Sequence, residues 1–219
     1  MSVVVVATEG DDLGSRVSRA SGGKAPRTAR GEKTRRKILD AALYEFGERG
    51  FAEASIVGIT GRAKVALGTF YTYFDSKDEV FRAVVSDLSE QVRQLVAPVL
   101  PGEGDAVDRE RRALAALLKL IASRKQVYRI IDEAEFVDPA GYERHYSGAA
   151  QRIAGRLKAA EEIGQVRPAG STFAEEVRAW AVMGANVFVG LRFGVWESAD
   201  PEEVAAVVSD LLRHGLQKR

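Results

Sequence analysis

The chain has no cysteine among its 219 residues and only two histidines, His145 and His214. Without cysteine there is no disulfide framework, no thiolate metal site and no cysteine nucleophile, and two histidines argue against an imidazole-based metal site. The lack of thiols also fits a reducing compartment. We therefore expect a cytoplasmic protein with no metal and no cofactor.

The signatures of several enzyme classes are missing as well. There is no P-loop, no G-x-G-x-x-G after a strand, no G-x-S-x-G elbow and no H-E-x-x-H pair. Neighbouring glutamates such as Glu133 and Glu135 occur in helical segments that also carry arginine, which is typical of ion pairs on exposed helix faces rather than of acid/base catalysis. The sequence thus gives no indication of an enzyme.

Strand patterns and a secretory leader are also absent. The opening M-S-V-V-V-V-A-T is too short for a signal peptide and lacks a basic start. The longest charge-free run, Ala179 to Leu191, is too short to cross a bilayer and predicts a helix that is buried on most of its faces. We expect an all-α protein with no membrane partner.

Positive charge is concentrated near the N-terminus although the formal net charge is only +1. Between Arg16 and Lys37 nine basic residues stand against the single acidic Glu32. This segment is interpreted either as a solvated tail, which we predict to be disordered over residues 1–30, or as an arm that contacts a phosphate backbone.

Apolar residues recur at helical spacing along the rest of the chain. Capping residues, prolines and glycines divide the pattern into separate helices. The predicted helices are Lys33 to Glu48, Ser55 to Arg62, a short helix within Ala63 to Tyr73, Lys77 to Val96, Asp105 to Ser123, Lys125 to Phe136, Pro139 to Glu162, Thr172 to Glu197, and a last one after Pro201.

The stretch A-K-V-A-L-G-T-F-Y-T-Y-F-D-S-K from Ala63 to Lys77 is the most informative part of the sequence. Val65, Phe70 and Phe74 recur at near-helical spacing and can anchor one face to a core, which leaves small, hydroxyl-bearing and aromatic side chains outward. A short helix capped by Ser55 precedes it, so the two form a helix-turn-helix, in which the second helix enters the DNA major groove.

The segment from about Thr34 to Phe81 resembles the TetR family of regulators. The resemblance rests on T-R-R-K-I-L-D-A-A-L-Y-E-F-G-E-R-G-F, then S-I-V-G-I-T, then G-T-F-Y-T-Y-F-D-S-K-D-E-V-F. It implies an N-terminal three-helix DNA-binding domain at 31–78 and a larger helical ligand-binding and dimerisation domain at 79–219. The loop P-G-E-G-D after Leu100 is a further candidate for the domain boundary.

Three positions depart from the family pattern. The family usually has Gly in the turn and Ser or Thr capping the second helix, whereas this chain has Lys64 and Ala66. Position 67, often basic in the family, is Leu67. A leucine favours an apolar contact, for instance with a thymine methyl group, over an arginine-to-guanine bond.

The resemblance implies a transcriptional regulator, most simply a repressor that binds a palindromic operator in double-stranded DNA as a homodimer and is released by a small, largely apolar effector. Two alternatives remain: a ligand-independent repressor, and a helical binding or catalytic bundle that is tethered to DNA. The residues expected at DNA are Lys33, Arg35, Arg36, Ser55, Lys64, Leu67, Gly68, Thr69, Tyr71, Thr72, Tyr73 and Lys77.

No motif marks the effector pocket or the interface, so those residues are hypotheses. Aromatic and polar residues of the C-terminal helices are candidates for the pocket: Tyr128, Phe136, Tyr142, Trp180, Met183, Asn186 and Phe188. For any one of the apolar and aromatic candidates core packing is the better-supported interpretation, and Asn186 is also interpretable as an interface residue. The glycines and apolar stripe of the last two helices are candidates for the dimer interface: Gly184, Gly190, Gly194, Val204, Val208 and Leu211.

Overall fold

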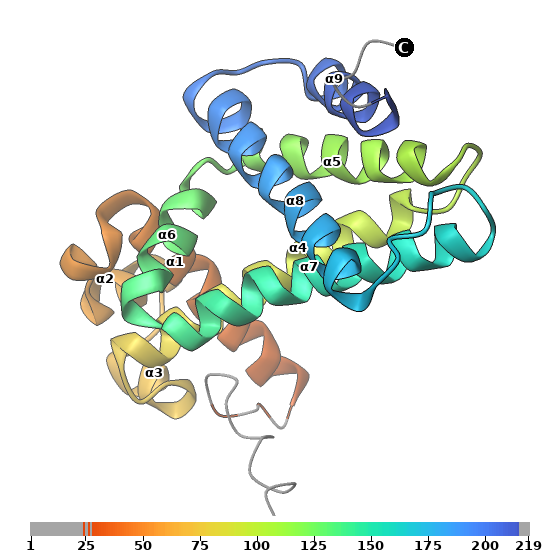
Figure 1. Cartoon of the computed structure of the whole chain (residues 1–219). Coiled ribbons are helices and arrows are strands. Elements are labelled where there is room, and N and C mark those ends of the chain that lie inside the picture. Colours follow the sequence, from red (N-terminus) through yellow and green to blue (C-terminus); the bar gives the residue numbers. More distant parts are fainter. Residues whose placement is uncertain (1–23, 25, 27, 215–219) are drawn as a thin grey trace, which may run out of the picture.

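A computed structural model describes residues 24, 26 and 28–214 of the chain. Its described residues form helices and no strand, which confirms the predicted all-α fold (Figure 1). Most of the predicted tail, residues 1–23, 25 and 27, lies outside the described residues, as do residues 215–219.

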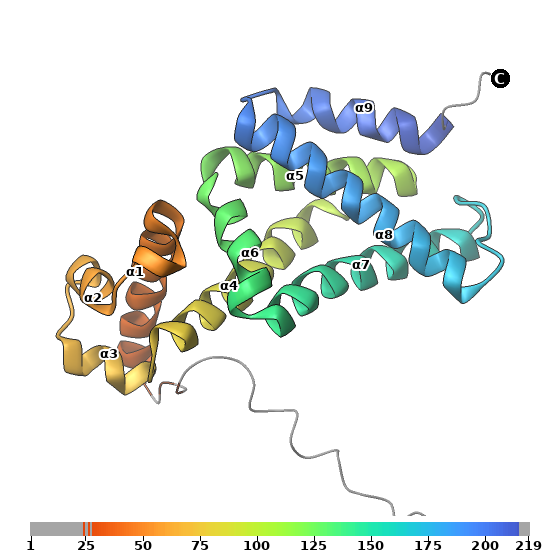
Figure 2. The same cartoon turned by 60° about the vertical axis from the view of Figure 1, so that its left-hand side comes forward.

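Three helices make a compact head at one end of the molecule (Figure 2). They are α1 (Ala29–Glu53), α2 (Ile56–Ala63) and α3 (Leu67–Tyr73). Phe46, Phe70 and Phe74 are fully buried between them. The α1 helix is broken at Gly50, which has φ 79° and ψ 168°, a backbone conformation that favours glycine.

Helix α4 (Lys77–Val96) leaves the head and runs into the larger part of the molecule, where the short 3₁₀ turn η2 (Ala97–Val99) ends it. Its first half packs Val80, Phe81 and Val84 into the same apolar cluster as the head. Ile130 and Ala134 of the C-terminal helices join this cluster. The two predicted domains therefore share a continuous core through α4, and the P-G-E-G-D loop at the far end of α4 does not separate them.

The larger part contains α5 (Ala106–Ser123), α6 (Gln126–Val137), α7 (Pro139–Glu162), α8 (Thr172–Val189), the π-helical η3 (Gly190–Trp196) and α9 (Pro201–His214). Helix α9 lies along α5, with Val208 against Leu114 and Leu118. Helix α8 lies across α7, with Ala179 and Met183 against Ile153. The predicted helix ranges agree with these bounds within a few residues.

Local capping explains most of the helix starts. The Ser55 and Ser76 hydroxyls accept from the amides of Gly58 and Glu79, at 3.0 and 3.1 Å, as predicted. Ser171, just before the predicted start of α8 at Thr172, caps this helix by accepting the Ala174 amide at 3.2 Å. Asp138 precedes Pro139 at α7, but its side chain makes no capping hydrogen bond.

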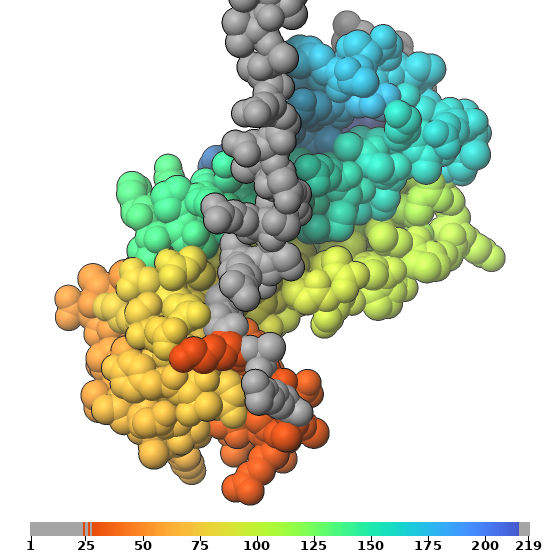
Figure 3. Space-filling model, turned by 90° about the horizontal axis from the view of Figure 1, so that it is seen from below, coloured from red at the N-terminus to blue at the C-terminus, as the bar shows by residue number. Residues whose placement is uncertain are grey.

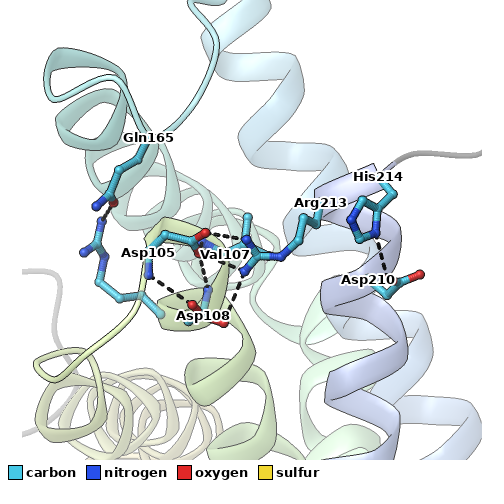
Figure 4. A network of polar contacts seen from close by, with 8 residues as sticks. Asp105, Val107, Asp108, Gln165, Asp210, Arg213 and His214 are labelled. Atoms are coloured by element: carbon cyan, nitrogen blue, oxygen red, sulfur yellow. Dashed lines mark hydrogen bonds and ion pairs between the residues drawn. The ribbon is translucent and has the colours of Figure 1, made fainter. Parts of the chain in front are cut away.

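A polar network ties the first turn of α5 to the end of α9 (Figure 4). Asp105 and Asp108 form a reciprocal capping box. Arg213 of α9 donates to both carboxylates, with 3.2 Å to Asp108. The Arg213 guanidinium holds the pKa of Asp105 at about 2, below its usual range. This contact fixes the position of α9 on α5.

Gly190 and Gly194 lie on the face of α8 and η3 that packs inside the subunit. Both glycines are buried, and a Cβ atom added to either would come within 2.8 Å of Ile121 on α5. The predicted role of these two glycines at the dimer interface is therefore wrong. They permit close approach of this helix to α5 and α6 of the same chain.

The continuous helical stretch Thr172–Trp196 is, by length and composition, apolar enough to cross a membrane. This is weak evidence, because helices that pack inside a protein pass the same test. Ala179, Val182 and Met183 bury one face of this stretch in the helical core.

Candidate nucleic-acid interface and internal cavity

The α2–α3 pair has the geometry of a helix-turn-helix. Lys64 ends α2 in the left-handed conformation, with φ 54°, and the Val65 amide then donates to the Thr60 carbonyl at 3.1 Å. The departure from the family pattern at Lys64 thus leaves the turn in place, at a backbone conformation that a lysine rarely adopts.

Helix α3 presents one face to solvent. Phe70 and Phe74 bury the opposite face, whereas Leu67 and Tyr71 are 48% and 45% exposed. A side chain added at Gly68 would meet open space. Of the other predicted contacts, Thr72 is exposed, while Thr69 and Tyr73 are half-buried. The space-filling view in Figure 3 shows this end of the molecule.

The basic residues that were predicted to contact DNA differ in exposure and in the contacts that they make within the protein. Lys33 and Lys64 are exposed. Arg36 donates to Asp40 at 2.9 Å and to Asp87 at 2.7 Å, and these contacts raise its pKa against the opposing effect of burial. Arg35 lies with its guanidinium 5.4 Å from the Phe74 ring centre.

Lys77 is occupied by the protein itself. Its Nζ atom donates to the carbonyl oxygens of Phe51, Ala52 and Ala54, at 2.7, 3.1 and 3.1 Å. These carbonyls belong to the end of α1, more than twenty residues away in sequence, so no local pattern could have indicated the contact. The predicted phosphate contact of Lys77 stays a prediction.

Three further ion pairs at the head were missed by sequence reasoning. Buried Glu45 of α1 faces Arg62 of α2 at 3.1 Å and Arg49 at 3.0 Å, which joins the first two helices. The Arg62 guanidinium also lies 3.6 Å from the ring centre of Tyr44. Lys24, before α1, pairs with Asp75 at 2.8 Å.

A cavity of about 190 Å³ lies among α4, α5, α6, α7 and α8. Most of its wall is apolar, including Val92 of α4, Leu117 and Ile121 of α5, Ile131 of α6 and Val187 of α8. Tyr128, Met183 and Asn186 of the predicted pocket residues line it. Tyr128 donates from its hydroxyl to the Val187 carbonyl at 2.5 Å.

The other four predicted pocket residues do not line this cavity. Phe136, Trp180 and Phe188 are exposed, at 83%, 39% and 71%. Tyr142 packs against the core cluster of the head. The prediction that these four residues line the pocket is therefore wrong, because aromatic composition does not indicate which face of a helix turns inward.

His145 lines the cavity and also a second, smaller hollow of about 180 Å³ beside α4. Its Nδ1 atom lies 2.7 Å from the Ser89 hydroxyl of α4. Burial lowers the pKa of His145 to about 4, and the positive charge of Arg152 adds to this shift. His145 is therefore a neutral hydrogen-bonding group at neutral pH that connects α7 to α4.

The apolar residues exposed on α8 form a stripe along one side of the helix. Phe173, Val177, Trp180 and Phe188 follow one another at spacings of four, three and eight residues, with Gly184 in open space between the last two. On α9, Val207 and Leu211 are exposed, whereas the predicted interface residues Val204 and Val208 pack on α5. We name these exposed residues of α8 and α9 the outer stripe.

Acid and base groups do not gather into a recognisable centre in the part of the chain that the structure describes. Within residues 24, 26 and 28–214, no group of three or more histidine, aspartate or glutamate side chains could hold a metal ion.

Comparisons with known proteins agree with this geometry. Residues 38–84 match the family model described as bacterial regulatory proteins, tetR family. The uncharacterized HTH-type transcriptional regulator YdgC of Bacillus subtilis is 26% identical over 195 residues, which cover 86% of this chain and 95% of that protein. HTH-type transcriptional regulator UidR of Escherichia coli is 27% identical over 81% of this chain and 87% of that one.

Solved structures share the fold across both parts. FadR of Bacillus halodurans, a fatty acid degradation regulator, superposes with a TM-score of 0.72 at 20% identity, over 90% of this chain and 99% of that one. FadR of Bacillus subtilis, in complex with stearoyl-CoA, superposes with a TM-score of 0.71 at 17% identity, over 83% of this chain and 99% of that one. At these identities the likeness concerns the fold alone.

Proposed function

Because the chain belongs to the TetR family of DNA-binding transcriptional regulators, we propose that it is a repressor that binds a palindromic operator as a homodimer and is released by a small, largely apolar molecule. The observation that carries this proposal is the position of α4. One end of α4 packs in the core of the DNA-binding head and the other end forms a wall of the cavity.

The proposed DNA surface is the outward face of α3 with its flanks. Leu67, Gly68, Tyr71 and Thr72 would contact base edges, with Thr69 and Tyr73 beside them. Phosphates would be contacted by Ser55 together with the amide end of α2. They would also be contacted by five basic residues: Lys33, Arg35, Arg36, Lys64 and Lys77. Exposure of Leu67 and Tyr71 at 48% and 45% supports this, because such large side chains are otherwise buried.

The proposed effector site is the cavity. Its apolar wall supports a largely apolar ligand, and Ser89, His145 and Asn186 supply a few polar groups that fix orientation. A solved structure of this fold, FadR of Bacillus subtilis, is in complex with stearoyl-CoA, whose stearoyl chain is apolar. A ligand that fits only one arrangement of α4 and α7 would shift the population of the DNA-binding form.

The test is to select the operator from random DNA and then measure release. Tyr71→Ala is expected to weaken operator binding by about 1–3 kcal/mol while leaving binding to unrelated DNA nearly unchanged. Equal losses on both kinds of DNA would remove α3 from base recognition. A screen for compounds that dissociate the complex then identifies the effector.

The two alternative functions make different predictions. A ligand-independent repressor would have a solid C-terminal core, and the cavity favours the ligand-responsive function over it. A catalytic bundle tethered to DNA would convert a bound metabolite, so turnover in an assay against a metabolite library would establish that function instead.

A further inference from the structure

The wall of the cavity carries three arginines at one region of an otherwise apolar lining. They are Arg93 of α4 and Arg152 and Arg156 of α7. Glu110 of α5, which is only 5% exposed, lines the same region. Arg93 and Arg152 are exposed and Arg156 is half-buried, so this charged region of the lining is in contact with solvent.

Two of the three arginines are neutralised by neighbouring carboxylates. Arg156 donates to Glu110 from Nε at 2.6 Å and from Nη2 at 2.8 Å, a bidentate pair. Arg93 donates to Glu90 from Nε at 2.7 Å and from a second nitrogen. Glu90 also accepts from Gln94 at 2.6 Å, so its oxygens are already engaged.

Arg152 is the exception. No hydrogen bond or ion pair joins its guanidinium to any described residue, although it lines the cavity beside the two paired arginines. Burial lowers the pKa of Arg152, and the like charges of Arg156 and Arg93 lower it further, while the negative charge of Glu90 opposes this shift. Three guanidinium groups thus face two carboxylates, which leaves one positive charge uncompensated at the cavity.

We propose, on the basis of the ligand-responsive function above, that the cavity binds an amphipathic anion whose carboxylate pairs with Arg152 and whose apolar chain lies among Leu117, Ile121 and Val187. A guanidinium offers a planar fork of donors that matches a carboxylate in two parallel hydrogen bonds. An anion would satisfy Arg152 and balance the excess charge in one step.

The shape of the lining indicates an elongated ligand. His145 and Arg152 are seven residues apart on α7, which places them about 10 Å apart along the helix axis at 1.5 Å per residue. The volume of about 190 Å³ exceeds the ~150 Å³ of an engineered apolar cavity that holds benzene. An acyl chain that runs from Arg152 toward His145 and Tyr128 would extend along the axis of α7 between these side chains.

The anionic head has two chemical sources. A free fatty acid offers its carboxylate directly, whereas an acyl-CoA offers phosphates beyond a thioester. Arg152 is exposed to solvent, so a head larger than a carboxylate would have room outside the cavity. We assign the carboxylate, because one guanidinium matches one carboxylate and the neighbouring arginines are already paired.

The test is calorimetric titration of the full chain with a matched set of probes: hexanoate, decanoate, palmitate, decan-1-ol, decyltrimethylammonium and decanoyl-CoA. At least one carboxylate is expected to bind, decan-1-ol at least tenfold more weakly than decanoate, and the cation not at all. Arg152→Gln should raise the Kd of the best carboxylate about 10- to 100-fold, which is the loss typical of a hydrogen bond to a charged group.

Two variants control this measurement. Lys158→Gln removes the same charge from the same helix, where Lys158 is exposed and lies 3.9 Å from Glu175, and is expected to leave the Kd unchanged. Arg152→Lys keeps the charge without the fork and should recover part of the affinity. Thermal unfolding of each variant shows that the helical core is intact.

The outcomes separate this inference from the proposed function. The inference is overturned if no carboxylate binds, if decan-1-ol binds as tightly as decanoate, or if Arg152→Gln binds like the parent chain. Tighter binding of decanoyl-CoA than of decanoate would overturn the carboxylate assignment. Arg152-dependent binding of a carboxylate that does not release operator DNA would support the inference and contradict the ligand-responsive function.

Discussion

Lys77 gains a structural role from its three hydrogen bonds to the end of α1. The carbonyl end of a helix carries partial negative charge, and an ammonium group there satisfies acceptors that lack a partner within the helix. The Phe51 ring lies 4.5 Å below the same Nζ atom. Lys77 therefore holds the start of α4 against α1, whether or not DNA is present.

Lys77→Met is expected to lower the free energy of unfolding by about 1–3 kcal/mol, because three carbonyl groups lose a charged donor. Urea denaturation measures this loss. Lys33→Met is the matched control, since Lys33 is exposed and should affect only the salt dependence of DNA binding. If Lys77→Met leaves the stability unchanged but lowers the slope of log DNA affinity against log salt concentration by about one unit, Lys77 is a phosphate contact alone.

Helix α3 begins without a side-chain cap. Ala66 occupies the capping position with extended φ and ψ angles of −68° and 149°, and its methyl group accepts nothing. The first amides of α3 are therefore incompletely paired within the protein. A residue with a side-chain oxygen at this position fits the same backbone, because capping residues adopt the β region.

Ala66→Ser is expected to raise the free energy of unfolding by about 0.5–1 kcal/mol by capping α3. Ser55→Ala, which removes the 3.0 Å capping bond of α2, should lower it by about 1 kcal/mol. Thermal and urea unfolding of the two variants beside the parent chain measure both effects. A serine at 66 that leaves stability unchanged would show that water or tertiary contacts already satisfy the α3 amides.

The helices themselves were predictable because their signals are local. Ser55, Ser76 and Asp200 each cap the helix that the pattern predicts after them. Which face of a helix packs inward is not local when apolar residues surround it. Helix α8 shows this, because Gly190 packs inside the subunit and Phe188, two residues earlier, is 71% exposed.

The candidate site likewise has one part that local sequence signals predict and another part that depends on contacts between distant segments. The face of α3 followed from the spacing of Phe70 and Phe74, which are both fully buried. The cavity depends on five helices meeting, and its charged region joins Glu110 to Arg156 across 46 residues of sequence. No periodicity within one helix carries that information, so the arginine cluster was missed.

The outer stripe of α8 and α9 is the candidate surface through which two subunits associate and bind DNA together. Phe173, Val177, Trp180 and Phe188 lie on the side of α8 opposite the buried Ala179 and Met183. A contiguous apolar surface of this kind is typical of an interaction site. Two helices from each subunit would form a closed four-helix interface with two-fold symmetry. Of the predicted interface residues, Leu211 belongs to the outer stripe and Gly184 lies along it.

Phe188→Glu is therefore expected to give a folded monomer, because the substitution places a charge in the proposed interface and leaves the core of the subunit intact. Operator affinity should fall about 10²- to 10⁴-fold, since two linked recognition helices bind two half-sites far more tightly than one helix binds one. Sedimentation measures the mass and titration of operator DNA measures the affinity. Phe136→Glu is the matched control, because Phe136 is 83% exposed on α6, outside the outer stripe. A Phe188→Glu dimer with normal operator affinity would place the interface on another surface of the molecule.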